Sequence, residues 1–376
     1  MTRYLTLDDV DVGGGIVLVR ADLNVPLTDD GQVADDFRLK AALPTLEHLV
    51  EAGAAVSVCS HLGRPKGHDP ALSMEVVAKA MDELTDYDVR FDSPGDITVL
   101  ENTRFLEGET TNDPATAEKL ADGFDLIVQD AFGSAHRAHA STVGISELVE
   151  SVAGPLLDAE LNALSRFLGE PDRPYTVVLG GAKVSDKLGV IENLLPSVDR
   201  MLIGGGMCFT FLKALGESVG DSLVEEDMLE KVSGFAGDDK IALPVDVVEA
   251  DAFAEDSQWN VTPVTEITDG WMGLDIGPDT SEDFGLLIRE SASVFWNGPM
   301  GVFEWEPYSN GTERVARALA ECDGFTAVGG GDSAAALRQF GLEDSVSHLS
   351  TGGGASLELL EGRVLPGVAV LERWVV

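Results

Sequence analysis

The chain has 376 residues, of which 44% are hydrophobic, and this length and composition are typical of a folded protein with two domains. Its formal net charge of -41, from 66 acidic and 25 basic residues, argues against nucleic-acid binding, which requires a basic face. No apolar run approaches the roughly 18 residues that span a membrane, and the start MTRYLTLDDVD lacks a signal-peptide pattern, so we expect a cytoplasmic protein that binds neither nucleic acid nor membrane.

The acidic residues are spread through globular segments such as TDYDVRFDSPGD and are not confined to a tail. Repulsion among so many like charges destabilises a compact state at low salt, whereas molar salt shortens the Debye length to about 3 Å and screens it. The composition therefore indicates a salt-rich cytoplasm, as in halophiles. The three cysteines, Cys59, Cys208 and Cys322, are far apart and flanked by apolar or small residues, which predicts reduced thiols and not metal ligands.

The first half of the chain alternates predicted strands and helices. The expected strands are Ile16–Arg20, Ala54–Cys59, Ile97–Leu100 and Phe124–Gln129. The expected helices are Asp36–Ala52, with Asp35 as N-cap, Ser73–Leu84 and Thr116–Ala121. This alternation predicts an α/β fold with a parallel, doubly wound sheet.

Polar and basic side chains follow the carboxyl ends of these strands, where ligands bind in open α/β sheets. Arg38 joins them from the first turn of a helix. The others are Asp22, Asn24, His61, Arg64, Arg104, His136 and Arg137. Because guanidinium groups suit carboxylate and phosphate oxygens, the set predicts an anion site; the alternative for any single arginine is a surface pair with one of the abundant carboxylates.

A leucine stripe lies between the two halves. Leu157, Leu161, Leu164 and Leu168 repeat at helical spacing within Pro155–Leu168, and GEPDRP at 169–174 ends the run. The pattern predicts an interdomain helix followed by a hinge.

The second half runs four times from an apolar stretch into a glycine cluster and then into a helix-like segment. The four are Tyr175–Lys183, Met201–Phe209, Thr326–Ala336 and Ser350–Leu360. Glycine lets a ligand approach the backbone, and helix N-termini attract phosphate, so the four together predict a nucleotide site at the carboxyl edge of a parallel sheet. The alternative is that some glycines only let helices pack tightly on strands.

Two lysines and one acid mark the phosphate chemistry. Lys183 and Lys187 are four residues apart in GGAKVSDK, one helical turn if the helix has begun. Asp332, beside glycine amides in GGGDS, is a candidate Mg²⁺ ligand, and helix N-capping is its alternative or additional role. The chain has no GxxxxGK[ST], and no GxGxxG follows a strand, which argues against a Walker-type protein and weakens a dinucleotide dehydrogenase.

These segments, taken in order, resemble the phosphoglycerate kinase family over nearly the whole chain. The matching motifs are ADLNVP, SHLGRP, DAFGSAHRAH, LGGAKVSDK, IGGGMCFTFLK, WMGLDIGP, WNGPMGVFE, VGGGDSAAA and HLSTGGGASLELLEG. Ser333 stands where the family usually has threonine, and ENTRF replaces the commoner ENLRF; neither change removes a charged group.

The resemblance implies two Rossmann-like domains with parallel sheets, joined by the interdomain helix and hinge. The implied domains are 1–154 for 3-phosphoglycerate, 155–174 for the helix and hinge, 175–361 for the nucleotide, and 362–376 for a C-terminal segment that returns to the first domain. The implied reaction is reversible phosphoryl transfer between 1,3-bisphosphoglycerate with ADP and 3-phosphoglycerate with ATP. A monomer is expected.

The resemblance also assigns site residues. The substrate set is Asp22, Asn24, Arg38, His61, Arg64, Arg104 and Arg137. The nucleotide set comprises Gly181, Gly205 and Gly273 for adenine, Glu304 for ribose, Lys187, Gly330, Gly331, Asp332 and Ser333 for phosphates with Asp332 on Mg²⁺, and Asn297. Arg38 and Lys183 are the expected catalytic cations, and the amides of Gly352, Gly353 and Gly354 are expected to stabilise the transition state.

Two other classes of protein compete with this interpretation. A nicotinamide-dependent oxidoreductase is compatible with the sheet and glycine turns but lacks the ordered glycine fingerprint. A non-catalytic nucleotide-binding or scaffold protein is argued against by the joint presence of Arg38, Lys183, Lys187 and Asp332.

Overall fold

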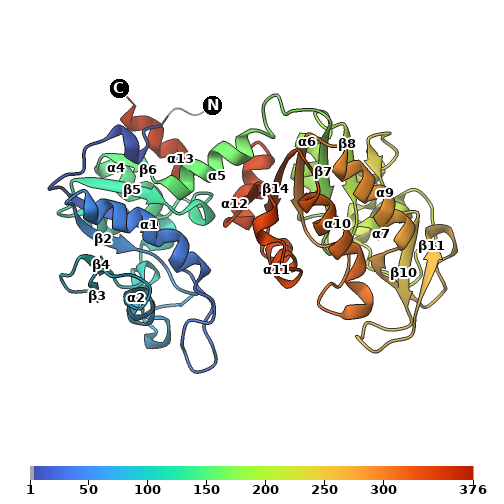
Figure 1. Ribbon diagram of the computed structural model, residues 1–376, viewed down its shortest axis with the longest axis horizontal. Coiled ribbons are helices and arrows are strands. Elements are labelled where there is room, and N and C mark those ends of the chain that lie inside the picture. The colour runs from blue at the N-terminus through green and yellow to red at the C-terminus, as the bar shows by residue number, and fades with distance from the viewer. Residues whose placement is uncertain (1–3, 376) are drawn as a thin grey trace. The chain divides into compact units, whose positions relative to one another are not determined.

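The computed structural model describes residues 4–375. The chain divides into two compact units: one runs to Asn162 and resumes at Val364, and the other comprises Ala163–Arg363. Both units are α/β, as predicted (Figure 1). Within the described residues, no helix combines the length and apolar character that crossing a membrane requires.

The first unit is built on a six-stranded sheet with the order β3-β4-β2-β1-β5-β6, and all of its strand pairs are parallel. The strands are β1 Ile16–Ala21, β2 Ala55–Cys59, β3 Val89–Phe91, β4 Ile97–Val99, β5 Leu126–Asp130 and β6 Ser151–Ala153. The predicted parallel sheet is therefore confirmed. The edge strands β3 and β6 were not predicted, because three residues are too few to show an alternating pattern.

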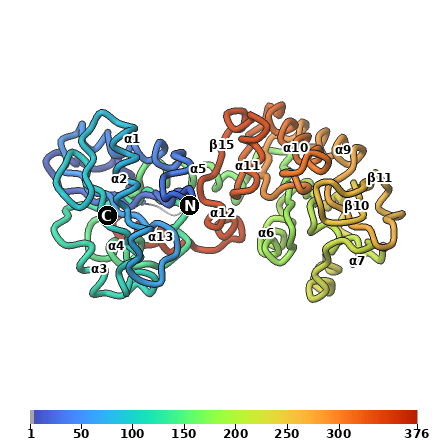
Figure 2. Tube along the Cα trace, turned by 90° about the horizontal axis from the view of Figure 1, so that it is seen from below, coloured from blue at the N-terminus to red at the C-terminus, as the bar shows by residue number. Residues whose placement is uncertain are grey.

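Helices cover both faces of this sheet, as Figure 2 shows with α1 and α2 on one side and α3 and α4 on the other. Their bounds are α1 Phe37–Glu51, α2 Glu75–Asp82, α3 Pro114–Ala121 and α4 Ile145–Leu148. Alternate residues of β1 serve the two faces: Val17 and Val19 belong to the core cluster under α1 and α2, and Leu18 to the cluster on the opposite face. Because β1 is buried on both faces, its sequence is a continuous apolar run, and that run predicted the strand.

The first helix begins one residue later than expected. Its N-cap position is Asp36, not Asp35, and the Asp36 side chain makes no capping hydrogen bond. Asp35 still accepts a hydrogen bond from the Phe37 backbone N–H at 2.8 Å. The prediction was therefore wrong about the position but right that an aspartate serves the start of this helix.

The last described residues pack within the first unit. Helix α13, Pro366–Ala369, and the 3₁₀ helix η11, Val370–Trp374, lie beside β6 and α4 in Figure 1. The Gly367 N–H donates to the Ala135 carbonyl at 2.8 Å, and Trp374 Nε1 donates to the Ser146 carbonyl at 2.8 Å. These bonds fasten the segment after Arg363 to the same unit as the first 162 residues.

Helix α5, Pro155–Ser165, begins at the end of β6. The buried Asp130 carboxylate accepts from the Leu156 and Leu157 backbone N–H groups at 2.7 and 3.2 Å, which satisfies the helix N-terminus. Three of the four predicted stripe leucines are buried, but Leu168 is 37% exposed because the helix ends at Ser165. Phe167 is buried in its place, 5.7 Å from the Tyr175 ring.

The second unit contains a six-stranded parallel sheet of order β15-β14-β13-β7-β8-β9. Its strands are β7 Tyr175–Leu179, β8 Arg200–Ile203, β9 Ile241–Ala242, β13 Ser293–Asn297, β14 Phe325–Gly329 and β15 His348–Leu349. The helices are α6 Leu188–Leu194, α7 Cys208–Ala214, α8 Leu229–Ser233, α9 Pro278–Arg289, α10 Asn310–Ala320, α11 Gly331–Gln339 and α12 Gly353–Leu360. In Figure 2, α9 to α11 lie on one side and α6, α7 and α12 on the other.

A three-stranded antiparallel sheet, absent from the sequence expectations, extends the second unit. Strand β10, Asp246–Ala250, pairs with β11, Trp259–Pro263, and with β12, Met272–Ile276. Its relevance to the site is that β12 carries Gly273.

Candidate active site

The first set of predicted residues gathers at the carboxyl edge of the first unit's sheet. Arg38 Nη1 lies 3.0 Å from Asp22 Oδ1 and donates to the Asn24 carbonyl at 2.8 Å. The Asn24 side-chain carbonyl accepts from the Gly63 N–H at 2.8 Å. The residues after β1, the loop after β2 and the first turn of α1 are thus joined by direct hydrogen bonds.

Arginines concentrate at the same edge. Arg104 Nη1 donates to the Gly63 carbonyl at 2.6 Å. Burial lowers the pKa of Arg104, and the nearby charges of Arg137, Arg64 and Arg20 lower it further. These cations lie close enough to affect one another in a chain whose net charge is -41, and an anion site at this edge stays a prediction.

His61 completes this cluster. Burial lowers its pKa to about 2, and the charges of Arg20, Arg104, His139 and Arg38 act in the same direction. The imidazole is therefore neutral near pH 7. Arg20 Nη2 lies 3.4 Å from His61 Nδ1.

Arg20, which no sequence motif predicted as a site residue, contacts this set through His61. Its side chain is fully buried in β1, and its Nε donates to Ser141 Oγ at 3.0 Å. The available signal was an arginine inside the apolar run IVLVR, because arginine is almost never fully buried without a partner.

The second set of residues gathers at the carboxyl edge of the other sheet, in the second unit. The glycine turns touch one another there: a Cβ on Gly205 would lie 2.5 Å from the Gly181 amide nitrogen, and one on Gly353 would lie 3.0 Å from Gly330 Cα. Gly330 has φ +97°, which favours glycine. The turns after β7 and β8 are therefore neighbours, as are those after β14 and β15.

Lys187 and Asn297 are linked at this edge. The Lys187 ammonium contacts the Asn297 side-chain carbonyl, and Asn297 Nδ2 donates to the Gly329 carbonyl at 2.8 Å. Burial lowers the pKa of Lys187, while the charges of Asp186, Asp332 and Glu361 oppose that shift. Ser333, fully buried, accepts from the Gly298 N–H through Oγ at 2.7 Å and so braces two of the turns.

The structure decides two points that the sequence left open. Helix α6 begins at Leu188, so Lys183 and Lys187 precede it and do not share a helical turn. The N-cap of α11 is Gly330, and Asp332 lies in the first helical turn.

Asp332, Lys183 and Glu304 are all exposed. Gly273 on β12 is packed against Phe209, where a Cβ would lie 2.0 Å from the ring.

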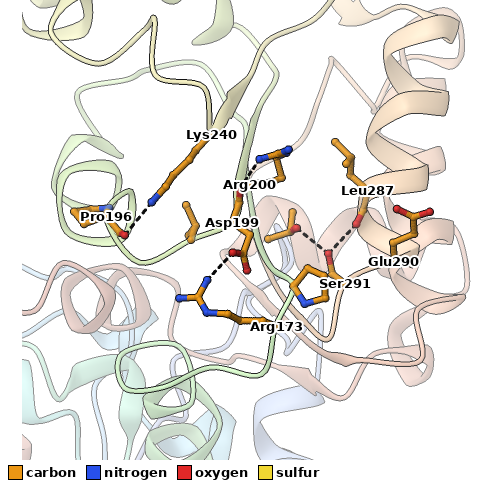
Figure 3. A pocket seen from close by; sticks show the side chains of 11 residues that line it. Arg173, Pro196, Asp199, Arg200, Lys240, Leu287, Glu290 and Ser291 are labelled. Atoms are coloured by element: carbon orange, nitrogen blue, oxygen red, sulfur yellow. Dashed lines mark hydrogen bonds and ion pairs between the residues drawn. The ribbon is translucent and has the colours of Figure 1, made fainter.

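A cavity of about 770 Å³ opens at the opposite, amino edge of the second sheet (Figure 3). None of the predicted site residues lines it. Arg173 pairs with Asp199 at 2.7 Å, and Lys240 Nζ donates to the Leu195 and Pro196 carbonyls at 3.0 and 2.9 Å. These cations are engaged within the chain, so the cavity is not the candidate site.

The fold and the two sets of residues define a class: an α/β protein with an arginine-rich sheet edge in one unit, called the anion edge after its predicted ligand, and a glycine-rich edge, the glycine edge, in the other. The family model described as "Phosphoglycerate kinase" matches residues 7–363. Curated phosphoglycerate kinases of Salinispora arenicola and Rubrobacter xylanophilus are 54% and 53% identical, covering 98% and 96% of this chain and 99% and 97% of their own lengths.

Solved structures agree with the sequence comparisons. Phosphoglycerate kinase from Coxiella burnetii has a TM-score of 0.91 at 40% identity, with 99% of each chain covered. The enzyme from Pyrococcus horikoshii has a TM-score of 0.85 at 30% identity, covering 98% of this chain and 99% of its own. This chain belongs to the phosphoglycerate kinase family and is a phosphotransferase.

Proposed function

We propose that this phosphotransferase catalyses the reversible transfer of a phosphoryl group between 1,3-bisphosphoglycerate with ADP and 3-phosphoglycerate with ATP. The observation that carries the proposal is family membership over residues 7–363 together with the anion edge and the glycine edge described above. We further propose that the enzyme acts as a cytoplasmic monomer in glycolysis or gluconeogenesis of a salt-adapted cell.

The substrate is assigned to the first unit. Arg64, Arg104 and Arg137 are the proposed phosphate ligands, and their support is proximity: the charges of Arg137 and Arg64 lower the pKa of Arg104. Asp22, Asn24 and the neutral His61 are proposed to orient the glycerate, since each belongs to the hydrogen-bonded cluster around Arg38 and Arg20. A carboxylate near pKa 4 is already ionised at neutral pH, so the attacking group needs no general base.

The nucleotide is assigned to the second unit. Lys187 and the turn Gly330–Ser333 are proposed to hold phosphates, Glu304 the ribose, and Gly181, Gly205 and Gly273 the adenine. Asn297 supports this assignment because it contacts Lys187 and the Gly329 carbonyl.

Asp332 fits a Mg²⁺ ligand. Its exposed carboxylate lies in the first turn of α11, and no ion pair or hydrogen bond occupies its side chain among residues 4–375. Mg²⁺ is commonly held by one or two carboxylates together with substrate phosphates and water, which matches a single acid beside a phosphate turn. The ion would neutralise charge on the phosphates.

Catalysis must bring an anionic carboxylate to an anionic phosphate, so cations and amides carry the proposed mechanism. Arg38 from one unit and Lys183 from the other are the proposed catalytic groups. The amides of Gly352, Gly353 and Gly354, at the start of α12, are proposed to bind the equatorial oxygens of the transferring group. Because these residues belong to different units, we propose that the two units come together when both ligands are bound, which also excludes water.

The direct test is a coupled assay with 3-phosphoglycerate and Mg-ATP at molar KCl. Phosphorylation of 3-phosphoglycerate that depends on both substrates and is abolished by EDTA is expected. An enzyme that binds NAD and fails to phosphorylate 3-phosphoglycerate would point to an oxidoreductase instead, and nucleotide binding without turnover would point to a non-catalytic protein.

A further inference from the structure

A buried charge lies directly behind the proposed substrate set. Arg20 is 0% exposed, and it has no ion pair with a carboxylate among the described residues. Its hydrogen bonds are to the Ala21 carbonyl, Ser141 Oγ and His61 Nδ1. An isolated buried cation is costly, because the protein interior solvates it poorly. The position therefore calls for a counter-charge close by.

The nearby negative charge is that of Glu109, which Ser141 links to Arg20 by hydrogen bonds. Its carboxylate is 1% exposed and accepts from the Ser141 backbone N–H at 3.0 Å and from Ser141 Oγ at 2.6 Å. The single Ser141 hydroxyl hydrogen is committed to Glu109, so the oxygen turns a lone pair toward Arg20 Nε at 3.0 Å. Each hydrogen bond of this series therefore has one possible direction: Arg20 donates to Ser141, and Ser141 donates to Glu109.

The next group in this series of hydrogen bonds is His61. A guanidinium carries only donors, so the contact between Arg20 Nη2 and His61 Nδ1 at 3.4 Å requires an unprotonated Nδ1. A neutral imidazole with a bare Nδ1 carries its hydrogen on Nε2. Among the described residues this is the one hydrogen bond of the ring, so Nε2–H is left as a donor for a ligand.

We propose that Glu109, acting through Ser141 and Arg20, is a positioning residue that keeps His61 in the Nε2–H tautomer needed to donate to the substrate. This inference rests on the proposed function for the identity of that substrate. The low pKa of His61 agrees with it, since a ring protonated on both nitrogens would face the charge of Arg20.

Other groups around the chain are consistent with this arrangement. His139 Nδ1 lies 3.9 Å from Glu109 Oε1. Burial lowers the pKa of His139, and the neighbouring Glu109 raises it. Arg104 and Arg38 add positive charge near His61, and neither of them replaces the bond from Arg20 to Nδ1.

The second unit offers a matched control. Glu249 is also 1% exposed and accepts from the Thr268 backbone N–H and Oγ1, both at 2.8 Å. The carboxylate, burial and donor pair are the same as at Glu109, but among the described residues no arginine donates to the Thr268 hydroxyl. Glu249→Gln should therefore lose as much local stability as Glu109→Gln. It leaves intact the series Glu109, Ser141, Arg20 and His61, which is called the relay below.

The experiment records the ¹⁵N shifts of the histidine ring nitrogens in the full-length, ligand-free enzyme at neutral pH and molar KCl, with His61→Gln used to assign the signal. Wild type should show His61 with protonated Nε2 and bare Nδ1. Glu109→Gln and Ser141→Ala should each give a mixture of tautomers, and Glu249→Gln should match wild type. In the coupled assay both relay variants should raise the KM for 3-phosphoglycerate by about tenfold, with the KM for ATP and kcat changed much less.

An unchanged His61 tautomer in folded Glu109→Gln and Ser141→Ala would overturn the inference, as would a wild-type ring with protonated Nδ1. Glu249→Gln raising the same KM equally would also overturn it, because the effect would then be general destabilisation. If Glu109→Gln does not fold, Ser141→Ala alone decides, since it breaks the relay and keeps both charges. A wild-type enzyme inactive on 3-phosphoglycerate would refute the proposed function, while the tautomer measurement would still judge the relay.

Discussion

Arg38 and Asp22 form an ion pair, Nη1 to Oδ1 at 3.0 Å, that joins the first turn of α1 to the loop after β1. The Arg38 side chain is 33% exposed and the Asp22 side chain 15%, so the pair lies at the rim of the arginine cluster and not in the core. An exposed pair of this kind contributes at most about 1 kcal/mol to stability. The guanidinium is thus held in place at little cost while remaining accessible to a ligand.

The first prediction concerns Arg38. If it neutralises the transferring phosphoryl group, Arg38→Ala should lower kcat by about 10³-fold, the scale of a lost arginine in phosphoryl transfer. Its free energy of unfolding should fall by no more than about 1 kcal/mol. Arg38→Lys should recover only part of the rate, because lysine lacks the planar fork. Steady-state kinetics and denaturant unfolding test this; near-normal kcat in Arg38→Ala would reduce Arg38 to an anion-attracting surface group.

The second prediction concerns Asp332 and Mg²⁺. Asp332→Asn keeps the size of the side chain and removes one charge beside Lys187 and the proposed phosphates. One charge at contact distance is worth about 1–4 kcal/mol, so half-maximal activity should need at least about fivefold more Mg²⁺. The KM for 3-phosphoglycerate should not change. Magnesium titrations of both enzymes decide, and superimposable curves would remove Asp332 from the metal site.

Apolar periodicity predicted the inner strands of the first sheet and the helices α1, α2, α3 and α5 to within a few residues, whereas α9 and α10 were not predicted. Asp22 and Arg38 could be assigned to one edge because parallel strands bring their carboxyl ends together. Arg20 was passed over because a strand residue's partners, here Ser141 and His61, come from distant loops.

Other features were set by tertiary packing and left no local pattern. Leu168 continues the leucine spacing, yet Phe167 takes the buried position because α5 has ended. In the sheet of β10 to β12, the strand Trp259–Pro263 exposes its apolar Trp259 and Val261 and buries only Thr262, so its apolar residues do not mark a buried face. Lys183 and Lys187 look like one helical turn until the start of α6 at Leu188 is known.

The third prediction concerns acid stability. His61 titrates near 6.5 when unfolded, and burial lowers its pKa to about 2 in the folded protein. Below pH 6.5 the unfolded state binds the extra proton, so the contribution is present above that pH and is lost as pH falls toward 2. The loss should reach on the order of 2 kcal/mol at pH 5. His61→Gln cannot titrate, so its unfolding free energy should decline less than that of wild type between pH 7 and pH 5. Parallel declines would show that His61 is protonated in the folded state.

The fourth prediction concerns the two ligands. The substrate set and the nucleotide set lie in different units, so neither ligand alone engages both. We expect 3-phosphoglycerate and a non-hydrolysable Mg-ATP analogue together to lower the radius of gyration, measured by small-angle scattering, more than either alone. Arg38→Ala should weaken this compaction if Arg38 contacts the transferring group. A catalytically competent mixture that does not compact would contradict the proposed approach of the units.

The last prediction concerns salt, and it follows from this chain's own charge. Acidic residues outnumber basic ones by 66 to 25, so one-to-one pairing leaves most carboxylates without a cation. Several of the basic side chains are moreover engaged at the anion edge or in exposed pairs such as Arg317–Glu313. Repulsion must then be offset by screening, and the net stability of a protein is only about 5–15 kcal/mol.

We therefore expect ligand-free protein dialysed to about 0.05 M salt, where the Debye length exceeds 10 Å, to lose activity and near-ultraviolet circular dichroism. Both should be retained near molar KCl. Titration with a second salt of equal ionic strength separates screening from specific ion effects: screening predicts overlapping curves, and ion-specific hydration predicts displaced ones. Full activity and an unchanged spectrum at about 0.05 M salt would mean that the carboxylates are spaced widely enough for the folded state to tolerate their charge.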